Sequence, residues 1–126
     1  MQDQLFEYAV IRIMPRVERE EFMNVGVIVY CSKQKFLQAL YCPNTERLEA
    51  FCKETDVQEI QNNLDAIGRI CKGASGSGPI AKLEIAARFR WLTATRSTVV
   101  QTSKVHPGLC TNPNETLLKL YNKLVL

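Results

Sequence analysis

Three short segments near the start of the chain alternate apolar and polar positions in the way that β-strands do. Phe6–Met14 is largely apolar on both of its faces, so it predicts a strand in the middle of a sheet, which Pro15 ends. Phe22–Cys31 is rich in β-branched residues, and Gly26 within it indicates a bulge or the close approach of another backbone. Phe36–Tyr41 follows after a short polar turn. The first forty residues therefore predict a three-stranded antiparallel meander.

Apolar residues recur at helical spacing in the middle and at the end of the chain. A short helix is expected with Thr45 as its N-cap. Asp56, with Glu59 three residues later, has the pattern of a capping box, and Gly73 ends the helix that Asp56 begins. The apolar stripe of that helix is formed by Val57, Ile60, Leu64, Ile67 and Cys71. Asn112 begins a final helix, and its apolar face consists of Leu117, Leu120, Tyr121 and Leu124.

The stretch between these two helices has a less regular pattern. Residues 73–79, GASGSGP, predict a flexible loop inside one domain, because they are too few to separate two. A third helix is expected over Pro79–Ala87, whereas Arg88–Thr93 fits a helix and a strand equally well. Thr98–Thr102 predicts a further strand of the sheet, and His106–Asn112 predicts a loop.

The fold expected from these elements is one α+β domain over residues 1–126. It has a small antiparallel sheet, made of the three-stranded N-terminal meander plus a later strand, packed with three to four helices. The composition agrees, since 46% hydrophobic and 23% charged residues are ordinary for a globular domain. No apolar run reaches the roughly 18 residues that span a bilayer, and MQDQLFEYAV lacks the basic start of a secretory signal. A cytoplasmic location without membrane contact is expected.

The cysteines predict neither a disulfide framework nor a metal site. They are odd in number and contain no C-x-x-C pair, which favours reduced thiols; they are Cys31, Cys42, Cys52, Cys71 and Cys110. No phosphate-binding loop or dinucleotide-binding glycine pattern is present, so no cofactor is expected.

The charges are distributed unevenly along the chain. Residues 1–73 hold nine Lys/Arg and eleven Asp/Glu, whereas residues 74–126 hold seven and two, so the second half carries a charge of +5. An anionic partner is expected to be drawn to that half. The acidic first half and a pI near 8.6 make nucleic acid an unlikely partner.

The segment RFRWLTATRS interleaves arginines with aromatic residues. Its candidate ligands for a carboxylate or phosphate are the guanidinium groups of Arg88, Arg90 and Arg96, with the hydroxyl of Ser97 beside the last of them. The structural alternative is that the arginines are solvated or pair with acids of the first half, while the aromatic rings fill the core.

Three further positions offer weaker candidates. His106, the only histidine, suits a general acid or base or a phosphate contact, although an exposed turn histidine is the commoner case. Glu18 lies in the alternating charges after Arg16 and suits acid/base work, against the alternative of local ion pairs. Asn24 offers an amide to a ligand, against a role at the entry of a strand.

Two long strings, YAVIRIMPRVEREEFMNVGVIVYC and RFRWLTATRSTVVQTSKVHPG, together with the closing Leu-rich helix, resemble the bacterial family known as domain of unknown function 3037. The resemblance covers nearly the whole chain. The residues it implies are Arg12, Arg16, Glu18, Asn24, Gly26, Arg88, Arg90, Trp91, Arg96, Ser97, His106 and Gly108. Thr95 stands where the family has a proline, and Pro107 where it has a polar residue, which concerns loop geometry. The family brings no assigned activity, and the resemblance implies a kinase-like partner of the toxin type.

Two hypotheses of different classes follow from the sequence. The first, which we favour, is a binding or accessory domain that recognises an anionic group or a protein partner through the Arg-rich segment, with Arg12, Arg16, Asn24 and His106 as further ligand-binding candidates. The second is an enzyme that acts on a phosphorylated or nucleotide-like substrate, with His106 or Glu18 as the acid/base. The sequence does not determine an oligomeric state.

Overall fold

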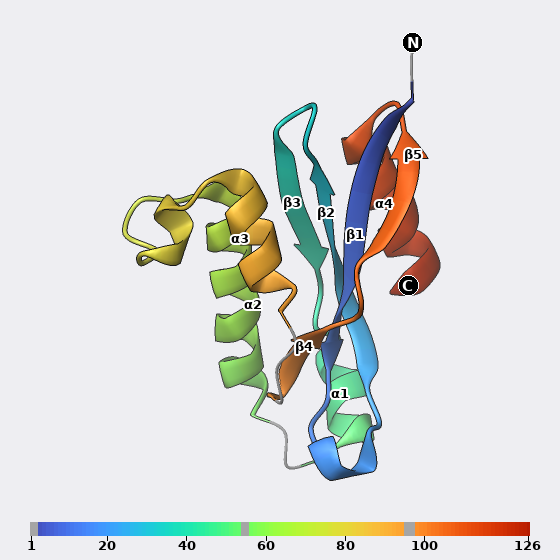
Figure 1. The fold of residues 1–126 in the computed structure, drawn as a ribbon. Coiled ribbons are helices and arrows are strands. Elements are labelled where there is room, and N and C mark those ends of the chain that lie inside the picture. The colour runs from blue at the N-terminus through green and yellow to red at the C-terminus, as the bar shows by residue number, and fades with distance from the viewer. Residues whose placement is uncertain (1–2, 54–55, 95–97) are drawn as a thin grey trace.

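The sheet is built around the first strand of the chain. Figure 1 shows a computed structural model that describes residues 3–53, 56–94 and 98–126. Within these ranges, five antiparallel strands form one sheet in the order β3-β2-β1-β4, and β5 also pairs with β1. The strands are β1 (Gln4–Ile13), β2 (Met23–Cys31), β3 (Phe36–Tyr41), β4 (Val100–Thr102) and β5 (His106–Cys110). The meander, the later strand and the central position of the first strand are confirmed.

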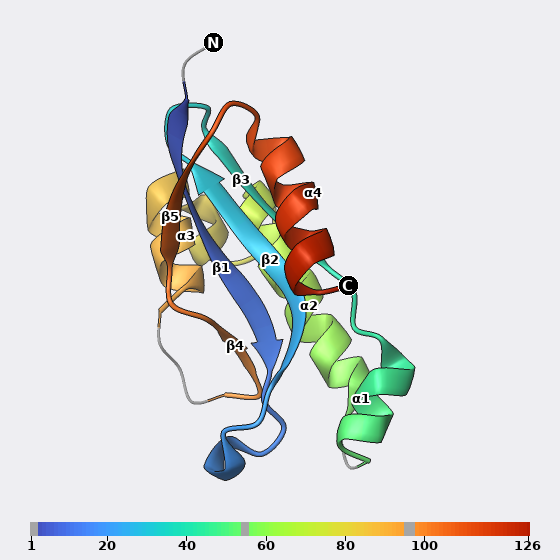
Figure 2. The same ribbon diagram turned by 90° about the vertical axis from the view of Figure 1, so that its right-hand side faces the viewer.

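Helices cover both faces of this sheet (Figures 1 and 2). Three of them lie on one face, and the last lies on the other. They are α1 (Thr45–Phe51), α2 (Val57–Lys72) and α3 (Ile85–Leu92) on the first face and α4 (Pro113–Leu124) on the second. Two short 3₁₀ segments, η1 (Val17–Arg19) and η2 (Ile80–Lys82), lie in connections. The α+β class expected from the sequence is therefore confirmed.

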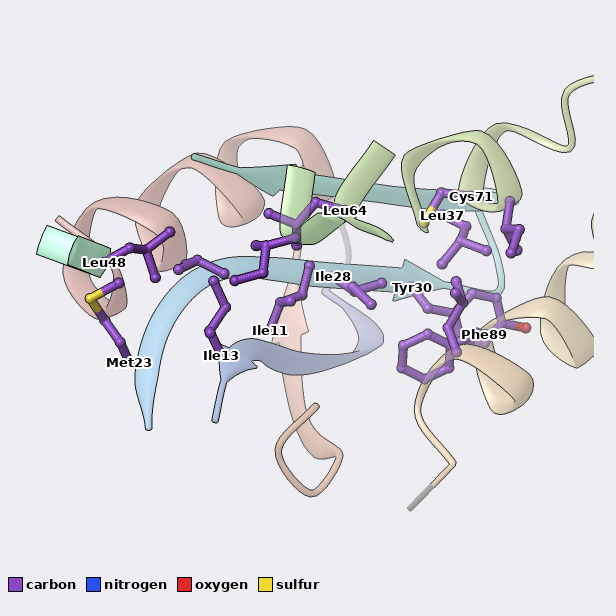
Figure 3. Close-up of a cluster of buried hydrophobic side chains, with 14 residues drawn as sticks. Ile11, Ile13, Met23, Ile28, Tyr30, Leu37, Leu48, Leu64, Cys71 and Phe89 are labelled. Atoms are coloured by element: carbon purple, nitrogen blue, oxygen red, sulfur yellow. The ribbon is translucent and has the colours of Figure 1, made fainter. Parts of the chain in front are cut away.

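The alternation of β1 produces two separate hydrophobic clusters, one on each face. Ile11 and Ile13 point towards α1, α2 and α3, where they pack with Leu48, Leu64 and Phe89. Figure 3 shows this layer running from Met23 and Leu48 at one end to Cys71 and Phe89 at the other. The second cluster lies under α4 and consists of Phe6, Val27, Val29, Cys31, Cys110, Leu117 and Val125. Because buried clusters lie on both faces of β1 and β2, most positions of these two strands are apolar.

Gly26 explains the irregularity in the pairing of β1 with β2. Ile11 lies opposite Gly26 but Arg12 lies opposite Asn24, so Val25 is the extra residue of a bulge. A Cβ atom at Gly26 would lie 2.6 Å from the carbonyl oxygen of Leu40, which is too close for any other residue. Both roles expected for this glycine are confirmed.

Most helix ends follow the capping residues predicted from the sequence. The Asp56 side chain accepts a hydrogen bond from the backbone N–H of Glu59, and Gly73 adopts the left-handed conformation with φ 63°. Asn112 caps α4. The prediction for Thr45 is wrong by one residue: Asn44 is the N-cap of α1, and its side chain accepts from the N–H of Arg47. Thr45 is the first residue of the helix instead.

The predicted helix over Pro79–Ala87 has the wrong boundaries. Pro79 precedes η2, and Leu83 and Glu84 are extended, so α3 begins only at Ile85. The helix then continues to Leu92, which resolves the ambiguity of Arg88–Thr93 in favour of a helix as far as that residue. Phe89 and Leu92 of this helix are buried in the core.

The prediction that His106–Asn112 is a loop is wrong. Residues His106–Cys110 form β5, which pairs with the first half of β1, while β4 pairs with its second half. Proline is tolerated at position 107 because β5 lies at an edge of the sheet. Gly108 makes room for the ring of Phe6, whose nearest atom would lie 2.5 Å from a Cβ there.

Candidate binding face beside helix α4

Helix α4 covers only part of its face of the sheet. It packs mainly against β2 and β3, and Figure 2 shows β1, β4 and β5 on the same side without a helix in front of them. We call this surface the open face and define it by Tyr8, Val10, Arg12, Asn24 and His106. Tyr8, Val10 and Arg12 share it because alternate residues of a strand point to the same side, and Phe6 of the same set packs under α4.

Aromatic rings occupy one end of the open face. The ring of Tyr8 stacks on Phe6, with centroids 6.0 Å apart, and lies 5.2 Å from the ring of His106 on the neighbouring strand. Phe6 is buried, Tyr8 is half-buried and His106 is exposed. The histidine therefore sits at the accessible end of a row of three rings. No nucleophile contacts it among the residues with described positions, where its ring contact is with Tyr8.

Arg12 forms the other end of the open face. Its guanidinium lies over the ring of Phe22, 4.1 Å from the centroid, which is a cation–π contact. Its Nε is buried and has no hydrogen-bond partner within the described chain. Neither of the two ion pairs described within residues 3–53, 56–94 and 98–126 involves this side chain.

Asn24 lies directly opposite Arg12 on the neighbouring strand. Its Nδ2 donates to the carbonyl oxygen of Leu124 at 3.1 Å, near the end of α4. Its Oδ1 is buried and, in the same described part of the chain, has no partner. A buried donor on Arg12 and a buried acceptor on Asn24 therefore lie on adjacent strands without satisfying each other. Buried polar atoms of this kind normally bind a protein group, a water or a ligand.

Ser103 connects the segment between β4 and β5 to β1 at the middle of this face, although the sequence did not mark it as a candidate. Its Oγ accepts from the N–H of Val10 at 2.8 Å, and its own N–H donates to the carbonyl oxygen of Val10 at 2.8 Å. It thereby continues the pairing with β1 between β4 and β5, where neither strand is formed. Ser103 is also the one buried polar residue among those described. The sequence contains no signal for this role, because the burial of Ser103 becomes visible only in the tertiary structure.

Arg88, the first candidate of the Arg-rich segment, is directed into the protein. Its Nη1 donates to the carbonyl oxygens of Ile70 and Cys71, at 2.9 and 3.0 Å, at the last turn of α2. The carbonyl oxygen of Ile70 also accepts from the N–H of Gly73, and the negative end of the helix dipole favours a cation there. The guanidinium therefore fastens α3 to the C-terminus of α2.

Arg90 is bound to a carboxylate on the opposite side of the sheet from α4. Its Nη1 and Nη2 donate to the two oxygens of Glu7 at 3.1 and 3.0 Å, which joins α3 to β1. The pairing of Arg90 with Glu7 fits the structural alternative, whereas Arg88 binds backbone carbonyl oxygens and not an acid. Arg96 and Ser97 lie outside the described residues, so their part in anion binding stays a prediction.

Arg16 and Glu18 lie in the connection after β1, far along the strand from His106. Arg16 borders a cavity of about 180 Å³, whose other lining residues are Pro15, Arg19, Glu21, Phe51 and Cys52. Glu18 is part of η1. His106 pairs with Tyr8, and the five residues from there to Ile13 span roughly 16 Å. The structure thus brings Arg12, Asn24 and His106 to one face and does not bring Arg16, Arg88 and His106 together.

The cysteines are free thiols on several elements. Cys31, Cys71 and Cys110 are buried, Cys52 is half-buried and Cys42 is exposed. Burial raises the pKa of Cys71 to about 12, against a smaller lowering effect of Arg88. Among the described residues, no three His, Cys, Asp or Glu side chains lie close enough together to hold a metal ion. In the same residues no helix is long and apolar enough to cross a membrane.

Comparison with known proteins gives a family but no activity. The family described as "Protein of unknown function (DUF3037)" matches residues 8–125, which is nearly the whole chain. No curated protein and no solved structure matches this chain. The matched range includes all the residues that define the open face.

Proposed function

The chain belongs to the DUF3037 family, whose description assigns no activity, and from this premise we propose that it is a binding domain that recognises an anionic group on the open face. The observation that carries the proposal is Arg12. Its guanidinium is stacked on Phe22 beside the unsatisfied Oδ1 of Asn24, and no carboxylate within the described residues neutralises it. A guanidinium group without an acidic partner among the described residues is suited to bind a carboxylate or phosphate.

Arg12 is favoured over Arg88, Arg90 and Arg19 because the guanidinium groups of those three residues already bind other groups of the protein. Arg88 binds the end of α2, Arg90 binds Glu7, and Arg19 pairs with Glu21. Stacking on a ring keeps the Arg12 guanidinium in a fixed plane, which reduces the entropy lost when it binds a planar or tetrahedral anion.

The rings of Tyr8 and His106, at the other end of the open face, indicate that the ligand also contains a planar group. Tyr8 and Arg12 are four residues apart on one strand, which places them about 13 Å from each other. A ligand with a planar group and a phosphate at this separation would stack on the exposed edge formed by Tyr8 and His106 while its anion meets Arg12. We therefore propose a phosphorylated, nucleotide-like molecule as the ligand class.

A thermal-shift experiment tests this proposal. Inorganic phosphate, pyrophosphate, adenosine monophosphate and adenosine diphosphate are each added to the wild type, to Arg12→Gln and to Arg47→Gln. A ligand present at about 100 times its Kd stabilises a protein by ~2.7 kcal/mol. We expect at least one adenosine phosphate to raise the Tm of the wild type and of Arg47→Gln but not of Arg12→Gln. Arg47 is the control, because it makes the same charge change on α1.

The proposal fails if none of the four compounds raises the Tm of the wild type. It also fails if Arg12→Gln responds as the wild type does, because the anion would then be bound elsewhere.

One enzymatic alternative is supported by a specific observation, namely that His106 is exposed on the same face as Arg12. In this alternative His106 acts as the acid/base on a phosphorylated or nucleotide-like substrate. Glu18 lies on η1 and would require a different site. Release of phosphate from adenosine diphosphate by the wild type, lost in His106→Gln, would favour the enzyme over the binding domain.

A further inference from the structure

The outer edge of β3 lacks the features that protect most edge strands. Among the described residues β3 has one neighbour, β2, so its other side presents unpaired backbone groups. Its sequence, FLQALY, contains no proline and no charged residue, and its pairing with β2 runs without a bulge. Proteins normally protect such edges with lysine, proline, bulges or a covering element, because an open edge pairs with other chains.

The opposite edge of the sheet is protected by contrast. It is divided between β4, which has three residues, and β5, which contains Pro107. The two edges of the sheet therefore differ in their protection against pairing with other chains. The six-residue edge of β3 is therefore the edge at which another strand can pair with the sheet.

The backbone groups that face outwards on β3 follow from the hydrogen bonds on its inner side. The N–H of Cys42 donates to the carbonyl oxygen of Val25 at 2.9 Å. Hydrogen-bonded pairs alternate with non-bonded pairs in an antiparallel ladder, so Leu40 and Gln38 also turn their backbone groups towards β2. The oxygen of Leu40 indeed points at Gly26. The N–H and C=O groups that face outwards are therefore those of Leu37, Ala39 and Tyr41.

A groove runs beside this edge, between β3 and α2. Its volume is about 480 Å³, and residues Gln38–Tyr41 form one wall. The helix is held next to the strand by the hydrogen bond from Tyr41 Oη to Asp65 at 3.0 Å. Gly68 permits this approach, because a Cβ there would lie 2.8 Å from the Tyr41 hydroxyl.

The free charges of the groove are positive. Arg69 and Lys72 of α2 line it and are exposed, and neither makes an ion pair within the part of the chain that is described. Asp65 is the acidic residue of the lining, and it already accepts hydrogen bonds from Tyr41 and Gln61. Residues three apart on a helix lie on the same side of it, so the two cations face the same partner.

From these observations we propose that the edge of β3 is a docking site for an extended, acidic peptide segment of a partner protein. The segment adds to the sheet as a further strand, and its backbone pairs with Leu37, Ala39 and Tyr41. Side chains at alternate positions of the segment point towards α2, and carboxylates there meet Arg69 and Lys72. This mode of recognition combines backbone hydrogen bonds for affinity with side-chain contacts for specificity. It uses neither Arg12 nor His106, so it is independent of the proposed function.

The test begins with a phage-displayed library of random peptides, each long enough to span the six residues of β3. The library is selected on the full chain, and the enriched peptides are synthesised and measured by fluorescence anisotropy. We expect enriched sequences with Asp or Glu at alternate positions. Ala39→Pro removes an outward N–H and should weaken binding about tenfold, which corresponds to ~1.4 kcal/mol. Ala39→Val keeps the N–H and is the matched control.

Charge reversal tests the chemistry of the partner separately. The double variant Arg69→Glu, Lys72→Glu should weaken the acidic peptides about tenfold or more and should select basic peptides instead. Amide exchange measured by NMR on the wild type gives a result that does not depend on the folding of any variant. The acidic peptide should slow the exchange of Leu37, Ala39 and Tyr41, whereas the amides of Gln38 and Leu40 are slow without it.

Three results would overturn the proposal. One is that no peptide is enriched, or that enriched peptides bear no acidic bias. Another is that the peptides protect none of the three outward amides. The third is that light scattering shows a dimer of the wild type that Ala39→Pro dissociates, because the occupant of the edge would then be a second copy of this chain.

Discussion

The contacts of Arg88 with the end of α2 indicate that this residue has a structural role. A guanidinium that donates to two carbonyl oxygens in the last turn of a helix adds hydrogen bonds there and interacts favourably with the helix dipole. Gly73 takes part in the same arrangement, since a Cβ there would lie 2.6 Å from Arg88 Nη1. We therefore treat Arg88 as part of the scaffold.

Replacement of Arg88 is accordingly expected to affect stability. Arg88→Ala removes two hydrogen bonds from a charged donor and should lower the free energy of unfolding by about 1.5–3 kcal/mol. Urea denaturation followed by circular dichroism measures the change. Arg90→Ala is the control, because an exposed ion pair such as that with Glu7 contributes at most about 1 kcal/mol. Equal losses in the two variants would contradict the role given to Arg88.

Arg12 shows why residue type alone did not identify the candidate site. The sequence offered several arginines of equal chemistry, and the Arg-rich segment was favoured because its arginines are close together in the chain. The structure separates them, since α3 turns Arg88 towards α2 and Arg90 towards Glu7. Arg12, on a strand predicted to be central, is the arginine that lies on the open face without an acidic partner among the described residues.

Among the elements, α2 is the helix whose ends are most completely specified by local residues. Asp56 caps its start, and at its end the N–H of Gly73 donates to Ile70 while that of Ala74 donates to Arg69. Its apolar stripe then packs Ile60, Leu64 and Cys71 into the core. Each of these features depends on residues a few positions apart, so the sequence was sufficient to predict them.

The caps provide a test at the scale of the element. Asp56→Ala should lower the free energy of unfolding by about 1 kcal/mol, because the N–H of Glu59 loses its acceptor. Thr45→Ala should change it by only a few tenths of a kcal/mol, since Asn44 and not Thr45 caps α1. Thermal and urea denaturation of the two variants compare these values. A larger loss in Thr45→Ala would restore the N-cap predicted from the sequence.

Strand β5 is the element that local sequence did not reveal. His106, Pro107 and Gly108 are residues of turns, and their pattern predicted a loop. They form a strand because β1 has ten residues and offers its whole length for pairing, so the chain after β4 continues along it. The pairing partner, and not the propensity of the segment, determines the conformation.

For the whole molecule, the buried thiols predict a loss of stability in alkaline solution. Burial raises the pKa of Cys71 from 9.0 to about 12 in the folded chain. Below pH 9 the Cys71 thiol is protonated in both the folded and the unfolded chain, so its titration does not lower the free energy of unfolding. Between pH 9 and 12 the unfolded chain releases the proton while the folded chain keeps it, so the free energy of unfolding falls.

Urea denaturation from pH 8 to pH 10.5 measures this effect. The wild type should lose stability over this range, and Cys71→Ala should lose less of it, whatever its stability at pH 8. Cys42→Ala is the comparison variant, because it removes a thiol from an exposed position instead of a buried one. An identical pH slope in the wild type and in Cys71→Ala would refute the prediction.

The sequence by itself determined the meander, the position of β1 inside the sheet, the boundaries of α2, the start of α4, and the role of Gly26. These follow from alternation, helical spacing and capping, which act between residues close together in the chain. The tertiary structure alone decided that His106–Cys110 is a strand, and that Arg88 and Arg90 bind groups 18 and 83 residues away. It also decided which arginine lies on the open face. Contacts between distant segments depend on how the layers pack, and no pattern within a single segment contains that information.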